Sequence, residues 1–175
     1  NQTLEKLGLH SLCYSLLLQT RDPSWLYSVR QGATTVWERW NSYTLERGFG
    51  DVGMNSFNHY AYGAVAEWLY SGMCGIKPDT EMPGWEHFFL APTPDMRSDD
   101  ELPEGQENIT SLKTSYESYH GTIVSNWSTE NGFDYYCEVA MPTRLYLPIL
   151  TKNDSFTLNG VSHKFSEFHQ APYND

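Results

Sequence analysis

The sequence has few basic residues. It contains 11 Lys and Arg against 22 Asp and Glu, which gives a formal net charge of −11. This charge repels a phosphate backbone or an anionic membrane surface, and no local cluster of Lys or Arg offers an exception. We therefore expect neither nucleic acid nor a membrane as a partner. Neutral substrates, sugars among them, stay open.

Cysteine is scarce as well, with three widely spaced residues at Cys13, Cys74 and Cys137. An odd number at such spacing gives neither a disulfide framework nor a zinc site, and it favours buried free thiols. The six histidines are scattered without the spacing of metal ligands, and no glycine-rich phosphate loop or serine-nucleophile motif occurs. We therefore expect no metal and no cofactor.

Long apolar runs are also missing, and none approaches the length that crosses a bilayer. The first residues have neither an initiator Met nor a signal-peptide pattern, so we expect the chain to be a piece of a longer protein. Asn-x-Ser/Thr acceptors occur at Asn1, Asn108, Asn126 and Asn153, where roughly two would arise by chance. This excess favours a periplasmic or secreted protein over a cytoplasmic one, but it does not decide the compartment.

Residues 1–76 are predicted to be helical. Four leucines recur near the 3.6-residue period of a helix: Leu4, Leu7, Leu12 and Leu16. Further apolar residues fall on the other sides of the same helix. A helix that is apolar on most sides is usually buried between other elements. The Asp-Pro-Ser stretch at 22–24 ends it and is predicted to cap a short second helix that runs through Val29.

Another helix is predicted over residues 55–72. Its apolar face holds Phe57, Ala61, Ala64, Val65 and Trp68. Beside that face lies a polar stripe at helical spacing, made of Asn55, Asn58, His59 and Tyr62. Polar groups next to a core face need partners. The stripe therefore either lines a water-filled cavity or is an ordinary helix flank with satisfied hydrogen bonds.

The pattern changes at residues 77–84, which we predict to be a linker. Beyond it, apolar residues alternate with a period of two. Strands are predicted over 86–91, 111–120, 122–127, 133–141 and 144–150, with a short hairpin over 155–165. Asn-Gly pairs at 131–132 and 159–160 are strong hairpin signals. We predict an α+β chain in which residues 85–165 form a small antiparallel β-sandwich, 93–108 an exposed loop and 166–175 a tail.

Glu38 is the best candidate for a catalytic carboxylate. It follows a Thr-rich turn and stands between Trp37 and Trp40, where a sugar ring could stack. The competing interpretation is a surface Glu that forms an ion pair with Arg39. His59 could orient a carboxylate or bind a sugar hydroxyl, although a single His on a helix is more often an ordinary polar residue with satisfied hydrogen bonds.

Three segments carry a resemblance to a known family. They are Pro23–Tyr27 (PSWLY), Gly32–Trp40 (GATTVWERW) and Met54–Val65 (MNSFNHYAYGAV), and residues 121–127 (GTIVSNW) extend the likeness into the predicted sandwich. In this order they resemble the bacterial-type α-L-rhamnosidases, which are inverting glycoside hydrolases. The likeness is dense over about residues 14–92 and sparser to about 150.

The resemblance implies that residues 1–76 are the C-terminal part of an (α/α)6 catalytic barrel, followed by the β-sandwich. It implies the hydrolysis of terminal α-L-rhamnose from a glycoside or polysaccharide with inversion. Glu38 matches the general base, His59 matches a sugar-contacting residue, and Asn55, Trp37 and Trp40 are expected around the same site. The general acid is expected in the missing upstream part of the same enzyme, so we expect the 175 residues alone to be inactive.

Two other readings of the sequence stay open. The chain could be a non-catalytic carbohydrate-binding or structural module in which the sandwich is the active part. It could also belong to another (α/α)-barrel carbohydrate-active enzyme. The aglycone, the linkage preference and the oligomeric state cannot be read from the sequence.

Overall fold

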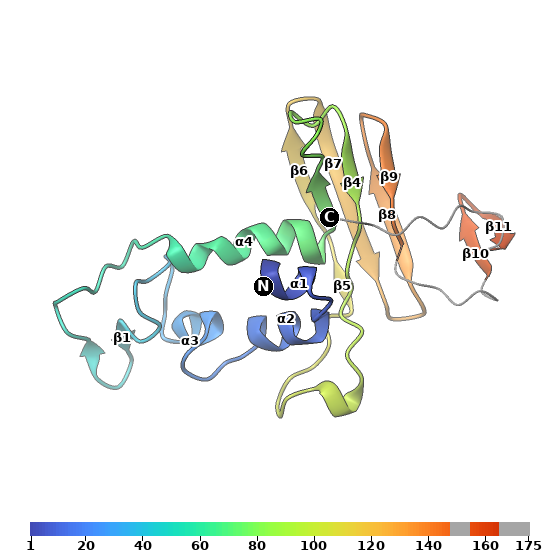
Figure 1. The fold of residues 1–175 in the computed structure, drawn as a ribbon. Helices are drawn as coiled ribbons and strands as arrows, with labels where there is room; N and C mark the ends of the chain where they lie inside the picture. Colours follow the sequence, from blue (N-terminus) through green and yellow to red (C-terminus); the bar gives the residue numbers. More distant parts are fainter. Residues whose placement is uncertain (148–154, 165–175) are drawn as a thin grey trace.

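The structure is a computed structural model that describes residues 1–147 and 155–164, and it has a helical part beside a sheet part (Figure 1). The helical part contains α1 (Gln2–Lys6), α2 (His10–Leu17), α3 (Trp25–Arg30) and one continuous segment made of η1 (Ala61–Ala64), α4 (Val65–Trp68) and η2 (Leu69–Met73). A two-stranded hairpin, β1 (Tyr43–Thr44) with β2 (Gly48–Phe49), lies at its outer end. No helix in the described ranges is long and apolar enough to span a bilayer.

Helices α1 and α2 replace the single helix predicted for the first residues. Gly8 separates them, because it adopts a φ of +73° after α1 ends and so turns the chain. Cys13 and Tyr14 of α2 face inward and are buried. Leu4 of the leucine stripe packs against this core, whereas Leu7, Leu12 and Leu16 are exposed, Leu7 at 68%. The prediction that this segment is buried between other elements of a larger helical assembly stays a prediction.

The helix predicted over 55–72 begins only at Ala61. Residues 55–60 are irregular, because their backbone groups pair with another loop instead of bonding within a helix: the His59 N–H donates to the Val36 carbonyl at 2.9 Å. Asn55, Asn58 and His59 are therefore loop residues, and the polar stripe that their spacing predicted is not a helical face. Ser24 does cap α3, as predicted, by accepting from the Tyr27 N–H at 3.0 Å.

Two sheets form the second part of the molecule. The first holds β3 (Ile76–Pro78), β4 (Phe88–Leu90) and β9 (Thr143–Leu145); the second holds β5 (Ser111–Leu112), β6 (Ser115–Ser118), β7 (Gly121–Ser128) and β8 (Asp134–Glu138). In the second sheet β7 is central, with β8 on one side and both β5 and β6 on the other. The sheet part thus follows most of the predicted strands; β7 is slightly longer than predicted and the others are shorter.

The sheets depart from the predicted sandwich in two respects. β4 and β9 run parallel, whereas an all-antiparallel sandwich was predicted. The whole second sheet separates these strands in sequence, so no hairpin fixes their relative direction. In addition, β3 occupies the first positions of the predicted linker and pairs with β4. Gly75 lets this strand begin, since its φ is +72° and a Cβ there would stand 2.1 Å from the Pro92 nitrogen.

Two clusters of buried residues form the core. The cluster between the sheets contains Cys74, Ile76, Phe88, Leu90 and Ile123, and the cluster under the helices contains Cys13, Tyr14, Trp68 and Met73. Leu112 packs against both. The Trp127 indole N–H of β7 also donates to the Met73 carbonyl at 2.8 Å. The helical and sheet parts therefore share a continuous packed junction.

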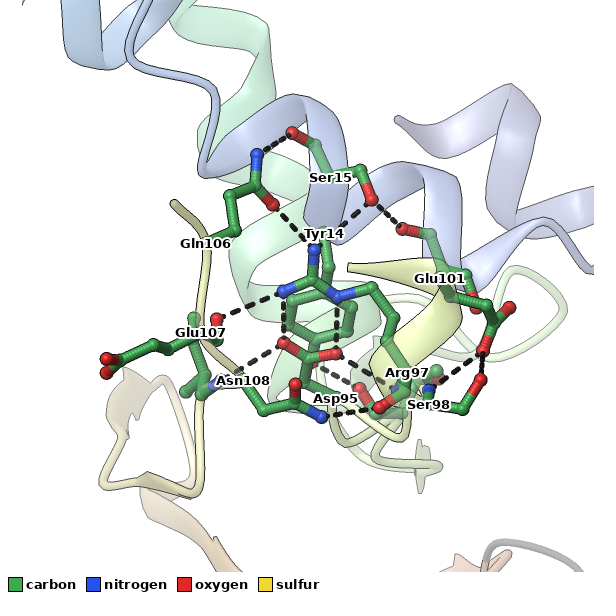
Figure 2. Close-up of polar contacts among 12 residues, drawn as sticks. Tyr14, Ser15, Asp95, Arg97, Ser98, Glu101, Gln106, Glu107 and Asn108 are labelled. Carbon is green, nitrogen blue, oxygen red and sulfur yellow. Dashed lines mark hydrogen bonds and ion pairs between the residues drawn. The ribbon is translucent and has the colours of Figure 1, made fainter. Parts of the chain in front are cut away.

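The acidic segment predicted as an exposed loop is partly buried. Its Asp95 and Arg97 side chains are fully buried and form an ion pair with two contacts of 2.8 Å (Figure 2). Arg97 also donates to Ser15 of α2 at 3.2 Å, and Asp95 accepts from the Ile109 N–H at 3.0 Å. Only the middle of the loop, around η3 (Asp99–Glu101), is exposed, so the prediction is wrong for its first residues.

The last described element is a hairpin of β10 (Ser155–Leu158) and β11 (Val161–Lys164), as predicted. Its turn residues Asn159 and Gly160 both have positive φ, 51° and 79°, as a two-residue hairpin turn of this kind requires. The predicted tail 166–175 and the end of the predicted strand 144–150 lie outside the described residues. The three cysteines are free, and Cys13 and Cys74 are buried, as the sequence predicted.

Candidate active site

Two loops bring the segments 32–40 and 54–65 together. The loop at residues 35–38 runs alongside the loop at 56–59. The Glu38 N–H donates to the Ser56 carbonyl at 2.8 Å, and the Thr35 hydroxyl donates to the Phe57 carbonyl at 2.5 Å. Residues 20 positions apart in sequence are thus fixed against each other by backbone contacts. This pairing determines where the Glu38 side chain lies.

The Glu38 carboxylate is half-buried and is held by the backbone. Its Oε2 accepts from the Ser56 N–H at 2.7 Å. Arg39 does not pair with it among the described residues, since its guanidinium donates to the Gly53 carbonyl at 3.1 Å. A surface ion pair between Glu38 and Arg39, the competing interpretation, is therefore not formed. The carboxylate has one oxygen anchored, and no described residue hydrogen-bonds to the other.

Trp37 and Trp40 occupy different surroundings on either side of Glu38. Trp37 is only 7% exposed, and its ring packs edge-on against Tyr43 and Phe57. The Trp37 ring supports the loop from the protein interior, and little of the ring stays accessible to a sugar. Trp40 is half-buried and stacks on Tyr62, with ring centroids 3.8 Å apart. One face of Trp40 is therefore already covered.

His59 and Asn55 each keep a buried polar atom without a partner. The unpartnered atoms are Nδ1 of His59 and Oδ1 of Asn55. The His59 ring stacks parallel to Tyr60, and the Asn55 amide nitrogen donates to the Ser42 carbonyl at 3.2 Å. Buried polar atoms usually have a hydrogen-bond partner, so both atoms call for an explanation. No described residue hydrogen-bonds to Nδ1 of His59, so its role in the site stays a prediction.

The largest hollow near these loops holds only one of the predicted site residues. It has a volume of about 650 Å³ and is bordered mainly by polar residues of the segment 39–51 and the β1–β2 hairpin. Asn55 lines it, whereas Glu38, His59, Trp37 and Trp40 do not. The described residues therefore bring Glu38 and His59 onto neighbouring loops without enclosing them in one pocket. Across the described ranges, no three His, Cys, Asp or Glu side chains stand close enough to hold a metal ion.

Two contributors to the site could not be identified from the sequence. Ser56 acts through its backbone N–H and carbonyl, and no side-chain pattern reveals such a role. Tyr60 is 89% exposed and its ring stacks on His59, a contact that helical spacing does not predict. Tyr62, expected in the polar stripe, instead packs on Trp40.

Comparison with known proteins identifies both parts of the chain. Residues 1–73 match the model of the bacterial α-L-rhamnosidase six-hairpin glycosidase domain, and residues 75–159 match that of the bacterial α-L-rhamnosidase C-terminal domain. The chain belongs to the bacterial α-L-rhamnosidase family. The two matched segments meet next to Gly75, where the helical part passes into β3.

Individual α-L-rhamnosidases are similar over much of the chain. An α-L-rhamnosidase of Alteromonas sp. is 42% identical over 75% of this chain and 13% of its own length, and one of Formosa agariphila is 38% identical over 94% and 17%. The crystal structure of Streptomyces avermitilis α-L-rhamnosidase complexed with L-rhamnose superposes with a TM-score of 0.70 at 35% identity, over 84% of this chain and 13% of that one. The chain therefore spans less than a fifth of these relatives.

Proposed function

We propose that the chain is the C-terminal part of an inverting α-L-rhamnosidase in which Glu38 is the general base. The observation that carries this proposal is the anchoring of the Glu38 carboxylate by the Ser56 N–H, on a loop that pairs with the His59 loop. Its substrate is a rhamnose-containing glycoside or polysaccharide. The rhamnose bound in the Streptomyces avermitilis relative supports this choice of sugar.

In an inverting glycosidase the base removes a proton from a water molecule that attacks the anomeric carbon. The bond to the leaving oxygen breaks, and a carboxylic acid donates a proton to that oxygen. The two carboxyl groups stand roughly 6.5–9.5 Å apart so that the water fits between them and the sugar. The free Oε1 of Glu38 takes the proton, while the Ser56 N–H keeps Oε2 in place. Water and two carboxyl groups suffice, so no cofactor takes part.

We infer that the unpartnered atoms on the loop that carries Ser56 serve the sugar once the rest of the site is in place. We assign His59 and Asn55 to contacts with sugar hydroxyls, because a hydroxyl can donate to the Oδ1 of Asn55 and to the Nδ1 of His59. Trp37 supports the loop from the core, and the uncovered face of Trp40 borders the site. These roles leave the general acid and the remaining sugar contacts to the missing upstream part of the enzyme.

That upstream part is also the proposed partner of the exposed leucines on α1 and α2. Leu7, Leu9, Leu12 and Leu16 are each 42–68% exposed on one side of the helical part. Such a patch on a protein surface marks a contact with other polypeptide. In this proposal residues 1–73 complete a helical barrel, and the sandwich begins directly after them with β3.

The test is a Glu38→Gln substitution in the full-length protein, assayed with an aryl α-L-rhamnoside. Gln keeps the size of the side chain and cannot accept the proton. Loss of general-base assistance costs about 10²–10⁴-fold in kcat, with KM little changed. Glu67→Gln on the exposed side of α4 is the matched control and should keep wild-type kcat. Wild-type turnover by Glu38→Gln would refute the assignment, and absence of activity in the wild type would refute the substrate.

A further inference from the structure

The outer face of the second sheet carries a row of side chains that the proposed reaction does not use. β7 pairs with β8 so that Asn126 stands opposite Tyr136 and Ser128 opposite Asp134. β5 and β6 pair with β7 in a single register, which places Lys113 opposite Asn126 on the other side. Because alternate residues of a strand share a face, Lys113, Asn126 and Tyr136 form one row across the sheet.

This face points away from the core. Ile123, Ser125 and Trp127 of β7 are buried beneath it, whereas the intervening residues are at least partly exposed. The Tyr136 ring is 55% exposed, and its hydroxyl donates to the Glu138 carboxylate two residues along the strand. This contact ties the ring to the sheet surface. A fixed, exposed aromatic ring offers an apolar face for stacking.

The amide of Asn126 is held in a defined orientation beside that ring. Its Oδ1 accepts from the Thr114 N–H at 2.8 Å, in the gap between β5 and β6. Its amide nitrogen hydrogen-bonds to no other described residue, so it has two donors available. A shallow groove of about 330 Å³ runs here, and Lys113, Asn126, Asp134 and Tyr136 all line it. This volume suits a small ligand of roughly one or two sugar rings.

The charges around the groove favour a neutral ligand. Lys113 and Asp134 offset each other at its two sides. Glu117 and Glu138 lie exposed on the same sheet, and the chain carries a formal net charge of −11, so an anionic glycan would be repelled. A stacking ring, oriented amide donors and balanced charges are complementary to the apolar face and hydroxyl rim of a neutral sugar.

We propose that the groove at Tyr136 and Asn126 is an accessory site for a neutral polysaccharide chain, separate from the active site. Its ligand is the polymer whose terminal rhamnose is removed, and this choice of sugar rests on the proposed function. The site holds the polymer near the enzyme through stacking on Tyr136 and hydrogen bonds from Asn126. Small aryl glycosides do not need it.

The test compares two substrates in the full-length enzyme. For Tyr136→Ala we expect KM for a neutral rhamnan polysaccharide to rise about tenfold through loss of stacking, with kcat/KM for an aryl α-L-rhamnoside unchanged. Tyr136→Phe keeps the ring and should stay within about twofold of wild type. Tyr119→Ala is the matched control, because Tyr119 is 93% exposed at the turn between β6 and β7 and outside the groove.

Retardation in a native gel that contains the same rhamnan measures binding without hydrolysis. Wild type and Tyr119→Ala should be retarded, and Tyr136→Ala should migrate freely. Equal retardation of all three would overturn the accessory site, as would equal KM values for the polysaccharide. An enzyme that binds rhamnan through Tyr136 yet hydrolyses no rhamnoside would refute the proposed function and leave the accessory site standing.

Discussion

At the scale of single residues, the position of the Glu38 carboxylate depends more on Ser56, its neighbour in space, than on Trp37 and Arg39, its neighbours in sequence. The motif at 32–40 indicated Glu38 as a catalytic residue, and the two tryptophans beside it suggested rings on which a sugar could stack. The structure uses Trp37 as core and covers one face of Trp40 with Tyr62. The backbone of Ser56 fixes the carboxylate. Side-chain patterns reveal candidate chemistry, but they do not reveal contacts made by backbone groups.

Cys13 gives a prediction for the response to pH. Burial raises the pKa of its thiol from 9.0 to about 11. The folded state therefore favours the protonated thiol, so its contribution to stability is intact below pH 9 and is lost between pH 9 and about 11. We expect the free energy of unfolding to fall across this window and to fall less steeply in Cys13→Ala. Urea unfolding of both proteins from pH 7 to 11 measures this, and equal slopes would contradict it.

At the scale of elements, the Asn-Gly signals predicted the β7–β8 and β10–β11 hairpins, whereas the β1–β2 hairpin was not predicted. The Asn159-Gly160 turn requires two residues with positive φ, and few residues other than Asn and Gly adopt this conformation easily. The helix at 55–72 was predicted too long, because its polar and apolar spacing extended into a segment that bonds to another loop. The buried part of the acidic loop was missed for a similar reason: Asp95 and Arg97 look like surface residues until each is paired inside the fold.

The Asp95–Arg97 pair gives a stability prediction for this loop. Arg97→Met leaves the Asp95 carboxylate buried without its cation, and removal of one partner of a buried ion pair costs about 3–5 kcal/mol. We expect this loss in the free energy of unfolding in urea. Arg47→Met, at an exposed position, should change it by less than about 0.5 kcal/mol.

The double variant Asp95→Leu/Arg97→Met separates the charge effect from simple loss of contacts. It removes both charges, so it should be more stable than Arg97→Met alone. A double variant that is less stable than Arg97→Met would show that the hydrogen bond from the Ile109 N–H to Asp95, more than the uncompensated charge, determines the effect.

At the scale of the whole molecule, the family was predictable, whereas the site residues and the segments that complete the site stay predictions. Ordered motifs such as GATTVWERW and MNSFNHYAYGAV are specific, and the comparisons confirm the family that they indicated. The described residues bring these motifs together, yet they do not enclose Glu38 in a pocket. The chain spans less than a fifth of its relatives, so we expect segments outside these 175 residues to contribute to the site.

The isolated chain is therefore predicted to be inactive. It lacks the proposed general acid, and loss of the acid and of substrate positioning removes most of the rate. Its exposed leucine stripe should also bind a hydrophobic dye such as ANS more strongly than the full-length protein does. Assay of both proteins with an aryl α-L-rhamnoside checks the first expectation. Comparable turnover by the isolated chain would contradict it.

The most direct test of Glu38 as general base is azide rescue of Glu38→Ala in the full-length protein. Azide is already anionic and attacks the anomeric carbon without a base, while the leaving oxygen still receives its proton from the general acid. The account predicts that azide restores turnover and yields β-L-rhamnosyl azide, the product of inversion. No rescue by azide, or formation of the α-azide, would contradict it.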